Sequence, residues 1–325
     1  MTIKFLLNKF SAKNIFEKQA APSVEETLVN ASDADFDDDD TLQAETEPEV
    51  AVLSKLEPHE IASYVDSLKE TAKYWYYTFF PEESDELISV EKEWLDKLNR
   101  IGIGYFRPLV AATLTPSANA SSEDRIDLFK AIERFIFLCF RMGVFQSSYK
   151  SSDYYRKAKD IYTGIILLSG VTQDINDTIA KDSAYAISNF ITRIGKKFTS
   201  GEGFYGWRDL RYLLYEYEYA MATKNNLTKV NWELFTKSEK DKVTIEHILP
   251  QTPSKLYWRN QFRQFSDKEK KILAGSLGNL LPLAQSINSS LQNDSFDERR
   301  PHTRFFRCEL GRSFPTTHGM KYLSI

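Results

Sequence analysis

The chain has 325 residues, 42% of them hydrophobic and 14% aromatic, enough to bury a substantial core in more than one domain. Its 42 basic and 46 acidic side chains give a formal charge of −4, which excludes a chain-wide positive field, so any nucleic-acid surface must be local. Two cysteines, Cys139 and Cys308, exclude a disulfide framework or a zinc–cysteine cluster and are typical of a reducing cytoplasm.

The first 55 residues predict two segments. Residues 1 to about 20 place apolar side chains at roughly helical spacing, which predicts one short basic amphipathic helix. Residues 31–49 are acidic, with four aspartates at 37–40, and predict a disordered linker; an arm that mimics nucleic acid is the alternative. The chain has neither a signal-peptide pattern nor an apolar run of membrane-spanning length, so we expect no membrane partner.

Residues 56–235 predict an all-α domain, because their apolar side chains recur with helical rather than alternating period. A stripe that starts at Ile61 is ended by Pro81. Further helices are predicted at 87–99, 105–113, 125–142, 153–166, 182–194 and 209–222. The aromatic side chains of these helices have the spacing of packing residues, so we assign no site to them.

After a charged turn at 236–242 the pattern changes from helix to strand, which predicts a domain boundary near residue 236. The β-branched run 243–249 is a strand stopped by Pro250. Ser266 and Glu269 have capping-box spacing before a short helix that ends at Gly275. A second short strand at 278–283 and a helix starting at 286–293 complete the predicted order.

His247 is the candidate for chemistry, because it follows Glu246 where the first of these strands ends. A neutral imidazole, with an ordinary pKa of about 6.5, is a suitable general base for hydrolysis of a phosphodiester. A hard cation such as Mg²⁺ prefers oxygen ligands, which Glu246 and Asn288 could supply. The amide of Asn279, on the second strand, could hold the imidazole in one orientation.

Strand geometry raises an objection to this site. Adjacent residues of a regular strand point to opposite faces, so Glu246 and His247 address one point only if the strand ends, bulges or twists there. On strict alternation His247 shares a face with Val243, Ile245 and Leu249, as a structural core histidine would. Periodicity alone favours the core histidine, and the catalytic interpretation depends on further evidence.

The motif set resembles the C-terminal HNH-like (His-Me finger) nuclease domain of GmrSD-type restriction endonucleases. The motifs that carry the resemblance are Ile245-Glu246-His247-Ile248-Leu249-Pro250-Gln251, Trp258 with Phe262, Leu277-Gly278-Asn279-Leu280, and Asn288 with Asn293 and Phe296. It covers residues 236–300, and residues 56–235 resemble the helical region that precedes this domain in those proteins.

The resemblance implies a mainly α fold in which a helical domain precedes a small α+β domain of the ββα-metal type. It implies His247 as general base, Asn279 as the residue that orients it, and Glu246 and Asn288 as ligands of Mg²⁺, Mn²⁺ or another divalent cation. The implied activity is cleavage or nicking of DNA, including modified phage DNA, in bacterial defence. Asn293, Arg299 and Arg300 are candidate substrate contacts.

Two departures from the family pattern are visible. The Gly-Gln-Gln-Arg-type motif of the family's ParB-like nucleotide-hydrolysing domain does not occur in this sequence, so we do not expect nucleotide dependence. Residues 301–325 form an atypical basic tail in place of closing helices. The alternative function is therefore a catalytically silent DNA-binding or assembly module that requires a partner carrying the missing N-terminal domain. Besides DNA, the candidate partners are another protein or further copies of this chain in a homo-oligomer.

Overall fold

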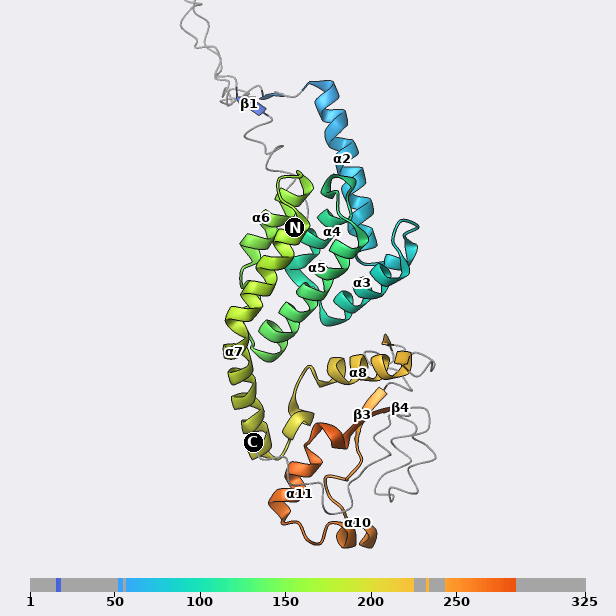
Figure 1. Ribbon diagram of the computed structural model, residues 1–325, viewed down its shortest axis with the longest axis vertical. Coiled ribbons are helices and arrows are strands. Elements are labelled where there is room, and N and C mark those ends of the chain that lie inside the picture. Colours follow the sequence, from blue (N-terminus) through green and yellow to red (C-terminus); the bar gives the residue numbers. More distant parts are fainter. Residues whose placement is uncertain (1–15, 19–51, 55–56, 225–231, 234–242, 285–325) are drawn as a thin grey trace, which may run out of the picture. The chain divides into compact units, whose positions relative to one another are not determined.

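A computed structural model describes residues 16–18, 52–54, 57–224, 232–233 and 243–284 (Figure 1). The chain divides into two compact units. The first comprises Met1–Lys92, Gly104–Ile126 and Lys150–Val171, and the second comprises Glu93–Ile103, Asp127–Tyr149 and Thr172–Ile325. The prediction of a mainly α protein with a small α+β carboxy-terminal part is confirmed.

The helical pattern of the middle region is borne out with revised ends. The α-helices are α2 (Pro58–Tyr77), α3 (Ser89–Ile101), α4 (Arg107–Thr113), α5 (Ser122–Phe135), α6 (Ser151–Tyr162), α7 (Leu168–Ser200), α8 (Leu210–Lys224), α10 (Leu256–Gln261) and α11 (Asp267–Ala274). A π-helical turn, Ile136–Met142, continues α5, and short 3₁₀ turns lie at Pro81–Glu83, Gly104–Phe106, Pro116–Ala118, Gly203–Gly206 and Leu277–Asn279. None of the described helices combines the length and apolar character needed to cross a membrane.

The strands form two antiparallel pairs. β1 (Phe16–Lys18) pairs with β2 (Val52–Ser54). The structure thus has a strand at 16–18, where the sequence predicts a helix. The reason is that the backbone groups of β1 form their hydrogen bonds with a segment that is distant in sequence. β3 (Val243–His247) pairs with β4 (Leu280–Ala284), in the order that the sequence predicts. The predicted helix at 286–293 and the tail lie outside the described residues.

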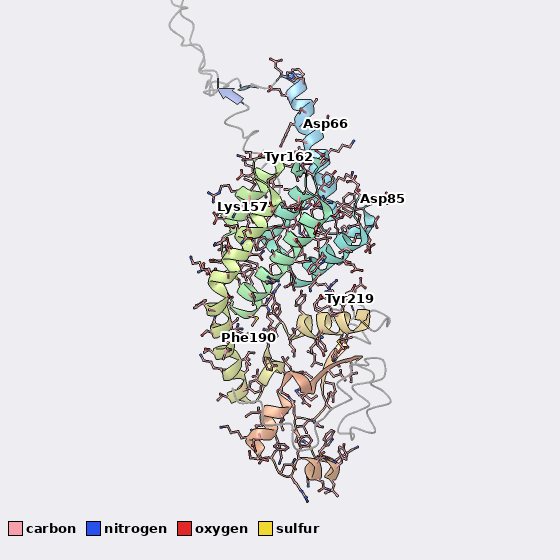
Figure 2. All side chains as sticks on the ribbon, viewed as in Figure 1. Asp66, Asp85, Lys157, Tyr162, Phe190 and Tyr219 are labelled. Carbon is pink, nitrogen blue, oxygen red and sulfur yellow. The ribbon has the colours of Figure 1, made fainter. Side chains whose placement is uncertain are left out.

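The first unit is held by an apolar core and one buried ion pair. α4 and α6 pack through side chains such as Leu109 and Tyr154, both of which are 0% exposed. Figure 2 shows all the described side chains on the ribbon. The fully buried carboxylate of Glu91 accepts a hydrogen bond of 2.6 Å from Nε of Arg125, whose Nη1 also donates to the carbonyl of Ala120. Both charges are therefore compensated inside the unit.

A polar network fixes α8 within the second unit. Glu216 accepts a hydrogen bond of 2.8 Å from Nε of Arg100, and the hydroxyl of Tyr212 donates to Glu133 over 2.8 Å. The ammonium of Lys97 lies 3.7 Å from Glu133 and 3.6 Å from Glu216. Because these side chains come from α3, α5 and α8, the network sets the position of α8 against the other two helices.

Glu218, also on α8, is in a different situation. It is 7% exposed, and in the part of the chain that the structure describes its carboxyl has no ion-pair partner. Burial raises the pKa of this carboxyl above its ordinary 4.5. The folded protein therefore holds a proton on Glu218 more tightly than the unfolded chain does.

We expect Glu218→Gln to stabilise the protein at neutral pH. Since the folded-state pKa is raised, wild-type stability falls as pH rises above about 4.5 and through the folded-state pKa, and the amide removes this loss. Denaturant unfolding of both proteins across pH should show a gain that vanishes in acid. The matched variant Glu216→Gln, which weakens the contact with Arg100, should instead lose about 2 kcal/mol at neutral pH. A destabilised Glu218→Gln at neutral pH would contradict this account of the buried carboxyl.

Candidate functional site

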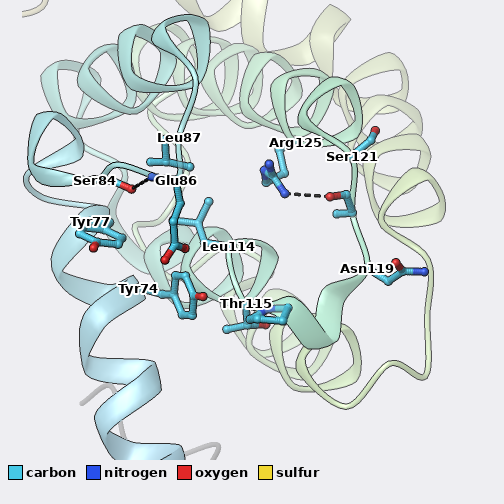
Figure 3. Close-up of a pocket in the computed structure, with 12 residues that line it drawn as sticks. Tyr74, Tyr77, Ser84, Glu86, Leu87, Leu114, Thr115, Asn119, Ser121 and Arg125 are labelled. Carbon is cyan, nitrogen blue, oxygen red and sulfur yellow. Dashed lines mark hydrogen bonds between the residues drawn. The ribbon is translucent and has the colours of Figure 1, made fainter.

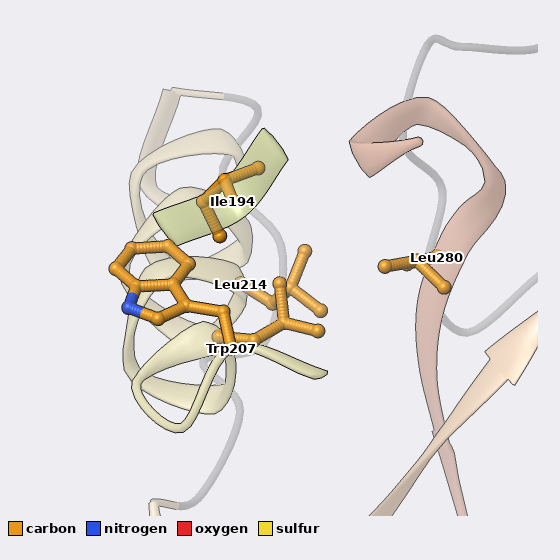
Figure 4. Close-up of a cluster of buried hydrophobic side chains, with 5 residues drawn as sticks. Ile194, Trp207, Leu214 and Leu280 are labelled. Carbon is orange, nitrogen blue, oxygen red and sulfur yellow. The ribbon is translucent and has the colours of Figure 1, made fainter. Parts of the chain in front are cut away.

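The β3–β4 hairpin is supported by an apolar cluster on α7, α8 and the turn between them. Leu280 of β4 is buried with Ile194, Trp207, Leu210 and Leu214 (Figure 4). The half-buried side chain of Ile245 on β3 packs against the same cluster. The face of β3 that carries Ile245 is therefore its inner face.

α8 also binds β3 directly. Nη1 of Arg211 donates a hydrogen bond of 2.7 Å to the carbonyl oxygen of Val243, and the ring of Tyr215 packs against the buried Val243 side chain. The guanidinium of Arg100, which belongs to the polar network described above, lies 5.1 Å from the centre of the Tyr215 ring. Tyr215 therefore contacts both Val243 and this network. The start of β3 is thus tied to a helix that is itself fixed.

His247 is the last residue of β3 and lies opposite Leu280 of β4. Its side chain is 9% exposed, and its ring centre lies 4.7 Å from that of Tyr205, with the ring planes inclined by 48°. Burial lowers the pKa of the imidazole below 6.5. The ring is consequently neutral at neutral pH, as a general base must be.

Tyr205 is a site residue that the sequence analysis does not identify. It lies in the Gly203–Gly206 turn, which is pressed against the end of α11: the N–H of Phe204 donates to the carbonyl of Gly275 over 2.8 Å. Gly203 has a φ of +55°, and a Cβ atom there would lie 2.5 Å from Cα of Gly275. The glycines that flank the tyrosine at 203 and 206 are the signal in the sequence that marks this close approach.

Asn279 is buried beside His247, but it acts on the main chain. Its Oδ1 accepts a hydrogen bond of 2.6 Å from the N–H of Leu249, and its Nδ2 donates to the carbonyls of Leu249 (3.1 Å) and Ala274 (2.9 Å). Both amide hydrogens of Asn279 are therefore used. In place of the predicted contact with the imidazole, its side chain forms hydrogen bonds with the main chain of Leu249, two residues after His247. The residue fixes where β3 ends.

The predicted metal ligands are placed only in part. Glu246 is half-buried on β3, next to His247 in sequence and opposite Leu281 in the ladder, and its carboxylate is the kind of oxygen donor that a hard divalent cation takes. Asn288 lies outside the described residues, as do Asn293, Arg299 and Arg300. Within the described ranges no group of three or more His, Cys, Asp and Glu side chains converges.

A separate concavity lies in the first unit (Figure 3). It has a volume of about 540 Å³ and is lined by α2, by the segment after it and by the start of α5. Tyr74, Tyr77 and Glu86 lie on one side of it. The ammonium of Lys73, a residue outside this lining, bonds to Glu86 and lies 5.3 Å from the Tyr74 ring centre. The charged groups of the concavity therefore already have partners, and we assign it no role.

Residues 191–317 match the model of the family described as GmrSD restriction endonucleases, C-terminal domain. This part of the chain is a GmrSD-type C-terminal domain. Neither any curated protein nor any solved structure shows significant similarity to the chain.

The GmrSD-type match begins inside α7 and includes most of the elements that pack around the two strands, although Phe137, Met142 and Phe190 of the same apolar cluster precede it. It takes in Ile194, the turn with Tyr205, α8 and both strands. The apolar core of the domain thus starts upstream of residue 236, where the change of pattern predicts a boundary. The boundary near residue 236 remains a prediction of where the segment that contains the strands begins.

The close approach of Gly203 and Gly275 yields a test of the GmrSD-type domain. Gly203→Ala combines a left-handed φ with a steric overlap, and we expect it to lower the free energy of unfolding by about 2 kcal/mol or more. Gly278→Ala is the matched control, because a Cβ atom there meets nothing within 4 Å. Denaturant unfolding measures both, and equal stabilities of the two variants would contradict the close approach.

Asn279→Ala tests whether the hydrogen bonds from the Asn279 side chain to the main chain stabilise the domain. The substitution leaves the buried N–H of Leu249 unpaired, so we expect a loss of roughly 2–3 kcal/mol. Asn260→Ala, at an exposed amide on α10, should leave the stability unchanged. Thermal and denaturant unfolding provide the measurement; if Asn279→Ala were as stable as wild type, its three hydrogen bonds would not be structural.

Proposed function

We propose that this protein is a metal-dependent endonuclease that cleaves or nicks DNA, with His247 as general base. The observation that carries the proposal is a neutral, buried imidazole at the end of a hairpin, adjacent to a carboxylate, within a segment that matches the C-terminal domain of restriction endonucleases. A buried core histidine would share the first features. The family match favours the catalytic reading.

The residues have distinct roles in this proposal. His247 takes a proton from the attacking water, for which its lowered pKa keeps it unprotonated at neutral pH. Asn279 is a positioning residue that sets the end of β3 through the main chain of Leu249. The ring of Tyr205 limits the orientations of the imidazole from one side.

The donor chemistry fits a hard divalent cation such as Mg²⁺ or Mn²⁺. Glu246 and Asn288 would hold it through one carboxylate and one amide oxygen, a set that leaves room for water and phosphate oxygens. When bound, the cation supplies positive charge beside the scissile phosphate. The substrate we propose is phage DNA, including modified DNA, encountered in the bacterial cytoplasm, with Asn293, Arg299 and Arg300 as further contacts.

Plasmid nicking with Mg²⁺ or Mn²⁺ tests the proposed base. We expect His247→Ala to reduce the cleavage rate by roughly 10²–10⁴-fold, which is typical for the loss of a general base. His59→Ala is the matched control, because His59 is an exposed histidine at the start of α2. It should cleave at the wild-type rate.

Equal product from wild type and His247→Ala would refute the role of this imidazole. Binding of DNA by the wild-type protein without turnover under any divalent cation would favour the catalytically silent module. Both variants should first be compared with wild type by circular dichroism, so that a folding defect is not mistaken for a catalytic one.

A further inference from the structure

The connection between β3 and β4 has a charge opposite to that of the chain. Residues 248–279 contain six basic and two acidic side chains, a net charge of +4, whereas the whole chain has −4. The basic residues are Lys255, Arg259, Arg263, Lys268, Lys270 and Lys271. This is the local positive surface that the whole-chain charge conceals.

Four of these cations are available to a ligand. Arg259, Arg263, Lys268 and Lys271 are exposed, and in the ranges that the structure describes none of the four makes an ion pair. Lys270 differs, because its ammonium lies 3.3 Å from Asp267. By contrast, cations that organise the fold, such as those of the α8 network, are paired with carboxylates.

A rigid support carries the four cations. Trp258 is 3% exposed, and its ring centre lies 6.1 Å from that of Phe262, which in turn lies 5.9 Å from Phe265. This aromatic series joins α10 to the segment that precedes α11. α11 begins with a capping box in which Oγ of Ser266 accepts from the N–H of Glu269, so its first turn is fixed.

Spacing places the cations in pairs. Lys268 and Lys271 are three residues apart on α11 and share one face of that helix. Arg259 lies on α10 and Arg263 in the turn that follows it, with exposed amides at Asn260, Gln261 and Gln264 around them. Guanidinium and ammonium groups with neighbouring amides are the side chains that most often contact DNA phosphates.

The connection leaves and rejoins the hairpin beside the candidate base. The N–H of Ile248 donates to the carbonyl of Asn279 over 2.9 Å, immediately after the His247–Leu280 pair. The side chain of Asn279 closes the same junction. The segment that contains α10 and α11 therefore begins and ends next to His247, at the end of β3 (Figure 1).

We propose that the exposed face of α10 and α11, defined by Arg259, Arg263, Lys268 and Lys271, binds the phosphate backbone of the duplex DNA that His247 cleaves. The inference deepens the proposed function and rests on it for the identity of the ligand. Arginine forks bind phosphate oxygens in pairs and lysines act as point charges, so the contact is independent of sequence. Its role is to hold the duplex, and catalysis remains with the hairpin.

Binding without cleavage tests the surface. Fluorescence anisotropy of a labelled duplex with the full chain, in buffer containing EDTA, measures affinity whether or not the protein is a nuclease. We expect Arg259→Gln/Arg263→Gln and Lys268→Gln/Lys271→Gln each to weaken binding at least about tenfold in low salt. Each pair should also reduce the slope of log affinity against log salt by about 2.

Lys159→Gln/Lys181→Gln is the matched control, because it removes two exposed lysines that lie elsewhere in the chain. It should bind like wild type, and all variants should have wild-type thermal stability. Unchanged affinity and salt slope in both surface variants would overturn the inference, as would tighter binding of a duplex RNA than of the DNA. Because no cleavage is measured, this failure is separate from that of the proposed function, which depends on His247→Ala in the nicking assay.

Discussion

The packing of the β3–β4 hairpin onto α8 and Trp207 is the constraint on which the candidate site depends. An isolated two-stranded hairpin is at most marginally stable in water, and each of these strands has only five residues. Leu280 is buried in the cluster around Trp207, which contributes about 1.5–3 kcal/mol, and the half-buried Ile245 adds a smaller amount. The orientation of His247 is therefore set by a helix some thirty residues upstream, which its own polar network holds in place.

Three main-chain contacts then fix the surroundings of the imidazole. The glycine contact between residues 203 and 275 brings the turn with Tyr205 to one side of the ring. Asn279 holds the backbone beyond the strand, and the Ile248 N–H closes the ladder. All three act without touching the polar atoms of His247. Together these contacts fix the main chain on both sides of a buried imidazole.

Local signals in the sequence were sufficient for most elements. The capping box of Ser266 and Glu269 locates α11, since it is formed by neighbouring residues. Pro250 predicts a strand that ends at residue 249, whereas β3 ends at His247, because the distant side chain of Asn279 binds the main chain of Leu249. Contacts between distant segments were not predictable in this way. The approach of residues 203 and 275 and the cover by Tyr205 require knowledge of the folded chain, and α7 runs through Leu168–Ser200 although only 182–194 showed a clear pattern. For the same reason the sequence does not show that the amide of Asn279 binds the main chain rather than the imidazole.

We propose that His247 lies beside the binding site of a divalent cation that Glu246 helps to hold. Paramagnetic broadening by Mn²⁺ of the imidazole proton signals tests it directly, because the chain has only four histidines. We expect selective broadening of the His247 signals at low Mn²⁺ and loss of that effect in Glu246→Gln. Undiminished His247 signals at Mn²⁺ concentrations that broaden other histidines would contradict it.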